Sequence, residues 1–193
     1  MNFRQKNDSK IISKMDLYFI ALIPHPALSK EIRALKDEIY KNTGAKKALN
    51  APAHITIQRP FRRINTFENQ LTDTLKLFAA GQNSFSIALS GFGCFEPRVI
   101  FVDVLKTTAL HRLHADLYTV LSDDLDFKPK EMNETIHPHV TIATRDLNKS
   151  SFYKVWPTYK DREFENEFTA KSIFLLKHNG KNWEILDEFL FKK

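Results

Sequence analysis

A short histidine–threonine pattern occurs twice in the 193 residues of the chain. Residues 54–57 read HITI, and residues 139–142 read HVTI. Successive side chains of a β-strand point to opposite faces, so the histidine and the threonine of each copy share one face. The β-branched residues point to the other face, where they can pack against helices. Each copy therefore predicts a strand with one polar face and one buried face.

These residue types suit phosphoryl transfer without a metal ion. One imidazole takes a proton from the attacking hydroxyl or water, and the other protonates the departing oxygen; an ordinary histidine pKa of about 6.5 serves both tasks. Threonine hydroxyls can donate hydrogen bonds to the non-bridging phosphate oxygens, which carry charge in the transition state. Ordinary packing at the edge of a core is the alternative, but the duplication favours function. We therefore predict that His54, Thr56, His139 and Thr141 are catalytic.

The surrounding sequence predicts alternating strands and helices. Short runs rich in isoleucine, valine and phenylalanine indicate strands at 17–23, 55–57, 85–89, 99–104, 140–143 and 170–177. Apolar residues at helical spacing indicate helices at 27–40, 67–78 and 108–121, and a further helix and a final pair of strands complete the order. A strand–helix–strand unit ends in the histidine–threonine pattern in each half. This repeat predicts two similar α+β lobes facing each other.

The motifs resemble those of the 2H phosphoesterase superfamily, whose bacterial and archaeal branch is called 2′-5′ RNA ligase-like or RNA 2′,3′-cyclic phosphodiesterase. The resemblance covers about residues 18–186 and includes FIAL at 19–22, GFGCF at 91–95 and PHVTIA at 138–143. It departs at 58–61, which read QRPF where many relatives carry FLG. Arg145 also stands one place later than the arginine that usually follows the second motif.

The resemblance implies a bilobal, pseudo-twofold α+β fold with two antiparallel sheets flanked by helices around a central cleft. We expect a single domain over residues 1–193, with residues 1–15 as a polar, partly flexible extension. The implied activity needs neither metal nor cofactor: it opens 2′,3′-cyclic phosphates of RNA ends or small nucleotides, or joins RNA ends in a 2′-5′ linkage. A non-catalytic module that binds RNA or nucleotides in the same cleft is the alternative.

Basic residues gather near the first histidine. The formal net charge is +6, and residues 41–63 hold six basic residues and no acidic one, so the whole excess lies there. Arginine binds phosphate through paired hydrogen bonds, so Arg59, Arg62 and Arg145 are predicted to bind substrate, with a solvated loop face as the alternative. Phe61 is an aromatic residue that could stack on a base or belong to the core.

Other polar residues carry weaker predictions. His137 lies close to the second motif and is expected in an exposed loop. His111 and His114 have a spacing that can bind metal but lack a third ligand, so no metal site is predicted. His25 and His178 are expected to be solvated. The segment 91–93 is expected to form a turn rather than a phosphate-binding loop, and the lone Cys94 is expected to be structural.

The sequence indicates no membrane segment. The apolar run at 18–23 is far shorter than the roughly 20 residues of a spanning helix. The polar N-terminus lacks the apolar stretch of a secretory signal. We therefore expect a monomeric cytoplasmic protein.

Overall fold

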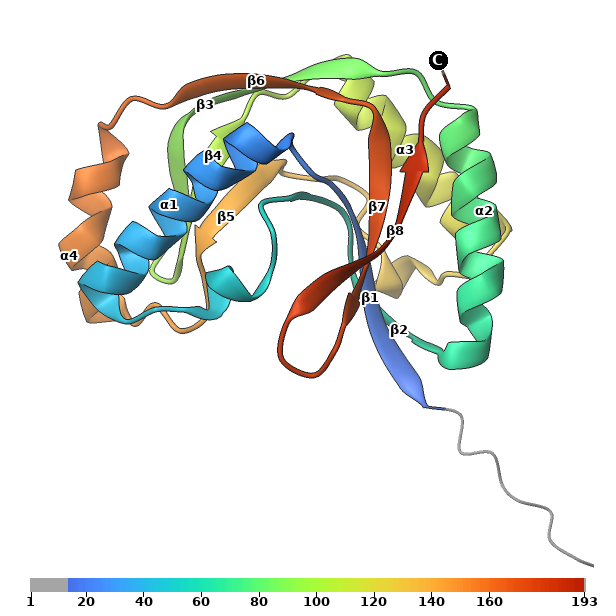
Figure 1. The fold of residues 1–193 in the computed structure, drawn as a ribbon, viewed down its shortest axis with the longest axis horizontal. Coiled ribbons are helices and arrows are strands. Elements are labelled where there is room, and N and C mark those ends of the chain that lie inside the picture. Colours follow the sequence, from blue (N-terminus) through green and yellow to red (C-terminus); the bar gives the residue numbers. More distant parts are fainter. Residues whose placement is uncertain (1–13, 193) are drawn as a thin grey trace, which may run out of the picture.

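The computed structural model describes residues 14–192, which form eight strands and four α-helices (Figure 1). The strands are β1 (Met15–Leu22), β2 (Ile55–Ile64), β3 (Phe85–Phe95), β4 (Val99–Val104), β5 (His139–Ala143), β6 (Glu165–Ala170), β7 (Ser172–His178) and β8 (Trp183–Leu190). The α-helices are α1 (Pro26–Thr43), α2 (Glu68–Ala80), α3 (Thr108–Asp123) and α4 (Lys149–Lys160). Three short 3-10 helices are η1 (Lys47–Asn50), η2 (Asn65–Phe67) and η3 (Pro129–Glu131). No helix within this range is long and apolar enough to cross a membrane.

The strands form two four-stranded antiparallel halves that meet at one seam. The strand order is β6-β3-β4-β5-β2-β1-β7-β8, and β5 and β2 are joined through the single pair Ile55–Val140. The helices cross between the halves: α1 follows β1 but packs on β5, and α3 follows β4 but packs on β2. The curled sheet with its two helix pairs is visible in Figure 1. The predicted bilobal α+β fold is confirmed, and the two predicted antiparallel sheets are the halves of one eight-stranded sheet.

Local signals in the sequence set the ends of α1. Pro26 occupies the first turn, where a missing backbone N–H leaves nothing unpaired inside the helix. The ring of the exposed His25 accepts a hydrogen bond from the Leu28 N–H at 3.3 Å and caps the helix. At the other end, Gly44 adopts a φ of 76°, a conformation that glycine tolerates best, and its N–H donates to the Tyr40 carbonyl at 2.8 Å.

The structure corrects the predicted elements at several places. The strand predicted at 170–177 corresponds to β7, which begins at Ser172, and the preceding strand β6 was not predicted. The chain crosses at Lys171 from pairing with β3 to pairing with β1 and β8. The turn predicted at 91–93 lies inside β3, where an irregular register near Gly91, with a φ of 66°, bends the strand. The predicted extension at 1–15 lies outside the described residues except for Lys14 and Met15, and Met15 begins β1.

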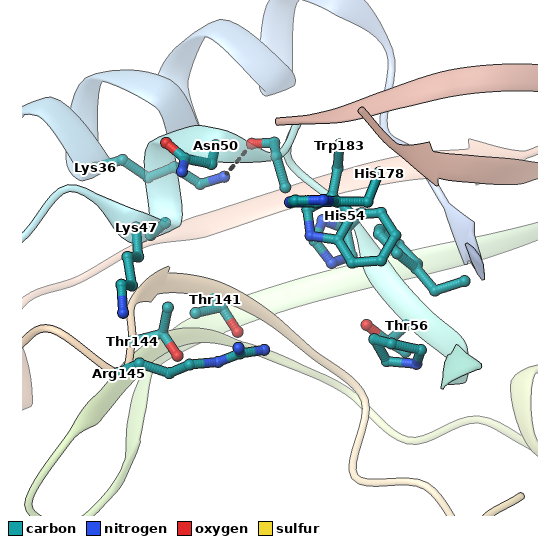
Figure 2. A pocket seen from close by; sticks show the side chains of 14 residues that line it. Lys36, Lys47, Asn50, His54, Thr56, Thr141, Thr144, Arg145, His178 and Trp183 are labelled. Atoms are coloured by element: carbon teal, nitrogen blue, oxygen red, sulfur yellow. Dashed lines mark hydrogen bonds between the residues drawn. The ribbon is translucent and has the colours of Figure 1, made fainter. Parts of the chain in front are cut away.

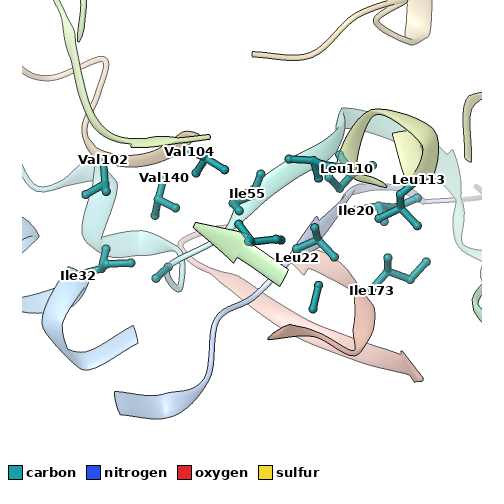
Figure 3. Packing of buried hydrophobic residues seen from close by; sticks show 14 of the residues in the cluster. Ile20, Leu22, Ile32, Ile55, Val102, Val104, Leu110, Leu113, Val140 and Ile173 are labelled. Carbon is teal, nitrogen blue, oxygen red and sulfur yellow. The ribbon is translucent and has the colours of Figure 1, made fainter. Parts of the chain in front are cut away.

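Both halves share one apolar core on the helix-covered face of the sheet (Figure 3). Ile55 and Val140, which flank the seam, are fully buried there together with Ile32 of α1 and Leu110 of α3. A separate small cluster of Phe19, Ala21 and Leu176 lies apart from this core. The sheet therefore has one face packed against helices and another face free to form a site.

Candidate active site

The two histidine–threonine segments lie side by side at the seam. β2 and β5 run antiparallel with Ile55 opposite Val140. In a register set by this pair, the position of His54 matches Thr141 and the position of Thr56 matches His139. All four polar side chains are partly exposed, whereas Ile55 and Val140 are fully buried. The polar face predicted from strand alternation is therefore continuous across both strands.

A cavity of about 360 Å³ opens beside these strands (Figure 2). His54, Thr56 and Thr141 line it, whereas His139 sits two residues before Thr141 on β5 and is not among the lining residues. The remaining wall is Phe19, Lys36, Lys47, Ala48, Asn50, Ala51, Pro60, Thr144, Arg145, His178 and Trp183. Three of these side chains are cationic, and no carboxylate of the described residues lines the cavity. Such a charge balance favours an anionic ligand.

Both histidines are held by the same kind of hydrogen bond. His54 Nδ1 lies 2.8 Å from the Pro52 carbonyl oxygen, and His139 Nδ1 lies 2.7 Å from the His137 carbonyl oxygen. A carbonyl can only accept, so each Nδ1 carries the hydrogen. The Nε2 atom of each neutral ring is then the one able to take up a proton, which is the arrangement an acid–base group needs.

A phenylalanine from the neighbouring strand packs against each histidine ring. The ring centroid of Phe19 on β1 lies 4.7 Å from that of His54, with an interplanar angle of 41°. The ring centroid of Phe101 on β4 lies 4.8 Å from that of His139, with an angle of 48°. The two halves thus fix their histidines by matching contacts, which limits the rotation of both rings.

Burial lowers the pKa of both histidines. Desolvation is the main cause at His54 and, with the nearby positive charge of Lys36, lowers its pKa to about 4. The pKa of His139 is also lowered, again mainly by desolvation, while the carboxylate of Asp103 acts in the opposite direction. In the unliganded protein His54 is therefore neutral at pH 7, whereas the Asp103 carboxylate opposes the loss of a proton from His139.

Folding stability should depend on pH through His54. Its pKa is about 4 in the folded chain and near 6.5 when unfolded, so the unfolded state binds more protons between these values and stability falls as the pH drops through this window. Between pH 7 and 4.5, the free energy of unfolding should therefore fall by about 1–2 kcal/mol less in His54→Gln than in wild type. Urea unfolding at the two pH values measures this difference. The exposed-site variant His111→Gln is the control. An equal loss in His54→Gln and wild type would contradict the prediction.

The predicted arginines divide between several places. Arg145 lines the cavity, as a substrate-binding residue would. Arg59 instead donates through Nε to the Glu131 carbonyl at 3.1 Å and through Nη2 to the Lys130 carbonyl, and so holds η3. Arg62 is exposed and lines a second cavity, of about 560 Å³, next to Lys177. Of the three arginines predicted to bind substrate, Arg145 therefore lines the cavity beside His54, whereas Arg59 and Arg62 do not.

Phe61 does not lie at the site. Only 4% of it is exposed, and its ring centroid lies 5.8 Å from that of Tyr18 and 4.8 Å from that of Phe127. Arg63 covers the same cluster, with its guanidinium 3.9 Å from the Phe127 ring centroid and Nη1 2.6 Å from Glu131 Oε1. Arg59 and Arg63 thus hold the loop around η3, and Lys47 is the cationic contribution of segment 41–63 to the cavity.

Several residues of the cavity wall were not predicted to belong to a site, among them Lys36, His178 and Trp183. Lys36 lies on the buried stripe of α1, where a charged residue breaks the apolar pattern; that break was the available signal. His178 and Trp183 come from β7 and β8, and their ring centroids lie 4.9 Å apart. No local pattern marks these two, because only the pairing of β7 with β1 brings them beside His54.

The other polar candidates lie away from the cavity. His137 is exposed, with Nε2 3.7 Å from Asp103 Oδ1, as expected for a loop residue near the second motif. His114 is buried on α3, and burial lowers its pKa. Within residues 14–192, no group of three or more His, Cys, Asp and Glu side chains could hold a metal ion. Cys94 is half-buried on β3, where burial raises the pKa of its thiol.

Comparisons with known proteins agree with this geometry. A family model described as the 2′-5′ RNA ligase superfamily matches residues 24–182. A protein of Geobacillus thermodenitrificans (strain NG80-2) named "Putative phosphoesterase" is 29% identical over 177 residues, covering 90% of this chain and 95% of that protein.

Two solved structures have a similar fold. The protein TT0787 of Thermus thermophilus has a TM-score of 0.67 and 18% identity, over 91% of this chain and 98% of that one. E. coli LigT complexed with 3′-AMP has a TM-score of 0.65 and 15% identity, over 93% of this chain and 100% of that one. At these identities the two structures support the fold.

Proposed function

The chain belongs to the 2′-5′ RNA ligase superfamily, a superfamily of phosphoesterase- and ligase-type enzymes, and we propose that it opens 2′,3′-cyclic phosphates by metal-independent acid–base catalysis. The observation that carries the proposal is the pair of Nδ1-anchored histidines beside a cationic cavity: His54 directly precedes β2, and His139 begins the adjacent strand β5. Substrates would be RNA ends or small nucleotides that bear the cyclic phosphate.

In the proposed reaction, a water oxygen bonds to phosphorus while one bond from phosphorus to a ribose oxygen breaks. The Nε2 atom of one histidine takes a proton from the water, and Nε2–H of the other protonates the departing ribose oxygen. The product is a 2′- or 3′-phosphate monoester, and exchange of one proton with solvent on each ring restores the starting state. A ribose 5′-hydroxyl in place of water would instead form a 2′-5′ linkage by the same two proton transfers.

The other polar residues of the cavity have roles that follow from their chemistry. The hydroxyls of Thr56 and Thr141 would donate to the two non-bridging oxygens of the phosphate, where negative charge concentrates. Arg145 and Lys47 would attract the substrate anion. Asp146 accepts from the N–H groups of Lys46 at 2.8 Å and Lys47 at 3.0 Å, and so ties the loop of Arg145 to η1.

The direct test is incubation of the protein with a nucleoside 2′,3′-cyclic phosphate and with an RNA that ends in one, both in the presence of EDTA. We expect a 2′- or 3′-phosphate monoester, identified by chromatography against both standards. An RNA with a free 5′-hydroxyl added to the second reaction reports 2′-5′ joining. Salt-sensitive binding without any turnover would reject the proposal in favour of a binding module.

Arg145 and Arg62 give a matched pair of variants for the cavity assignment. Arg145→Met should raise KM for a nucleoside 2′,3′-cyclic phosphate about tenfold, the effect of losing one charged hydrogen bond, with a smaller change in kcat. Arg62→Met should leave both constants close to wild type, because Arg62 lines the other cavity. Steady-state kinetics at low ionic strength measure both. Equal effects of the two variants would show that charge acts only at long range.

A further inference from the structure

Lys36 is a buried lysine whose position the proposed reaction has not yet explained. It lies on α1 with 2% of its surface exposed, and it lines the cavity. Its Nζ donates to the Ala51 carbonyl at 3.0 Å and to the Pro52 carbonyl at 3.3 Å, and no carboxylate pairs with it among the described residues. An ammonium buried with only carbonyl partners is unfavourable for folding, so its presence calls for a reason.

The Pro52 carbonyl connects this lysine to the first histidine. The same oxygen accepts from Lys36 Nζ at 3.3 Å and lies 2.8 Å from His54 Nδ1. Figure 2 shows Lys36 reaching the chain just before His54, with its bond to Ala51 drawn. The lysine thus fixes the two carbonyls that lead into β2. An oxygen held from one side by a cation is a fixed acceptor for the histidine on its other side.

The charges around the two histidines differ although their anchoring matches. On the His54 side, the charged or titratable groups are Lys36 from α1 and, around the cavity, Lys47, Arg145 and His178. On the His139 side, Asp103 of β4 stands opposite His139 in the register, and the neighbouring group is His137. One half therefore places a cation beside its histidine, and the other half places a carboxylate.

We propose that Lys36 is a positioning residue: by holding the Pro52 carbonyl against His54 Nδ1 and placing a positive charge beside the ring, it keeps His54 as the base, while Asp103 favours His139 as the acid. The assignment of His54 as base and His139 as acid rests on the proposed function. The physical asymmetry between the two rings is independent of it. A neutral His54 leaves Nε2 free to accept a proton from water, and a proton retained on His139 is available to the leaving oxygen.

The test is a histidine titration by NMR on the full chain, with His54 and His139 assigned through their glutamine variants. In Lys36→Met the titration midpoint of His54 should rise by about 0.5–1 pH unit while that of His139 stays fixed. In Asp103→Asn the midpoint of His139 should fall and that of His54 should stay fixed. Lys30→Met, an exposed lysine on the same helix, should change neither.

Two further readings separate positioning from a structural role. Methionine is an unbranched side chain one atom shorter than lysine, and it removes a buried charge, so Lys36→Met should unfold at or above the temperature of wild type. Nitrogen chemical shifts should show loss of the single Nδ1–H tautomer of His54 in this variant but not in Lys36→Arg. If Lys36→Met does not fold, two other measurements decide the question. They are the tautomer of His54 in Lys36→Arg and the titration midpoint of His139 in Asp103→Asn.

The outcomes distinguish this inference from the proposed function. An unchanged His54 midpoint and tautomer in Lys36→Met would overturn the role of Lys36, whatever the activity of the wild-type protein. No turnover of the cyclic phosphate by wild type would overturn the proposed function and leave the NMR result standing. If both hold, the acid-side midpoint of kcat/KM in Lys36→Met should move upward together with the His54 titration.

Discussion

Replacement of either histidine by alanine should lower the hydrolysis of a nucleoside 2′,3′-cyclic phosphate by about 10²–10⁴-fold. The reason is that each ring supplies one of two proton transfers that occur in the same step. In His54→Ala one of the two proton transfers is lost, and in His139→Ala the other is lost. Initial rates over a range of substrate concentrations measure the effect, which should fall mainly on kcat.

The double variant gives a sharper form of this prediction. Residues that act as a unit are strongly non-additive, so His54→Ala combined with His139→Ala should lose little more than the more damaging single change. His111→Ala, on the exposed face of α3, is the matched control and should retain the wild-type rate. Thermal unfolding of each variant establishes that the fold persists. Wild-type turnover in both single variants would exclude acid–base catalysis by these rings.

The second large effect is expected at Gly93, where β3 passes closely over a ring of β4. Gly93 pairs with Phe101, and a Cβ added to it would lie 2.5 Å from Phe101 Cζ. Phe101 itself packs against His139, with ring centroids 4.8 Å apart. Gly93→Ala must therefore displace the ring that supports the second histidine. We expect a loss of about 2–3 kcal/mol in the free energy of unfolding, together with a lower kcat.

Two variants isolate this overlap from a general effect of alanine. Gly81→Ala is the control, because its Cβ would meet the Phe78 carbonyl oxygen at an ordinary 3.4 Å. Reducing the ring by Phe101→Leu in the Gly93→Ala background should recover part of the lost stability. Urea unfolding and cyclic-phosphate hydrolysis are measured on all three. If Gly93→Ala were as stable as wild type, the Phe101 ring would move aside without cost and the prediction would be contradicted.

Strand alternation explains why so much of the site was accessible from the sequence. His54 and Thr56 share a face because they are two residues apart on a strand, and the same holds for His139 and Thr141. That relation depends on local backbone geometry alone. The helices at 27–40, 67–78 and 108–121 are confirmed for a similar reason, because their apolar spacing follows from the turn of the helix itself.

The arginines show where local reasoning ends. Arg59 and Arg62 lie within eight residues of His54 in sequence, yet β2 extends to Ile64 and carries them beyond the cavity. Because a strand rises about 3.3 Å per residue, residues that are close to His54 in sequence lie far from it along β2. The resulting partner of Arg59 is the η3 backbone, which nothing near Arg59 in the sequence predicts.

By itself the sequence determined the chemical groups, the strand faces that present them and the family to which the chain belongs. Only the tertiary structure decided which groups meet. The pairing of β2 with β5 brings the two motifs together, and the packing of α1 on β5 brings Lys36 to the Pro52 carbonyl. The physical reason is that strand register and helix docking depend on the burial of apolar side chains across the whole core, whereas periodicity reports only on each segment's own backbone.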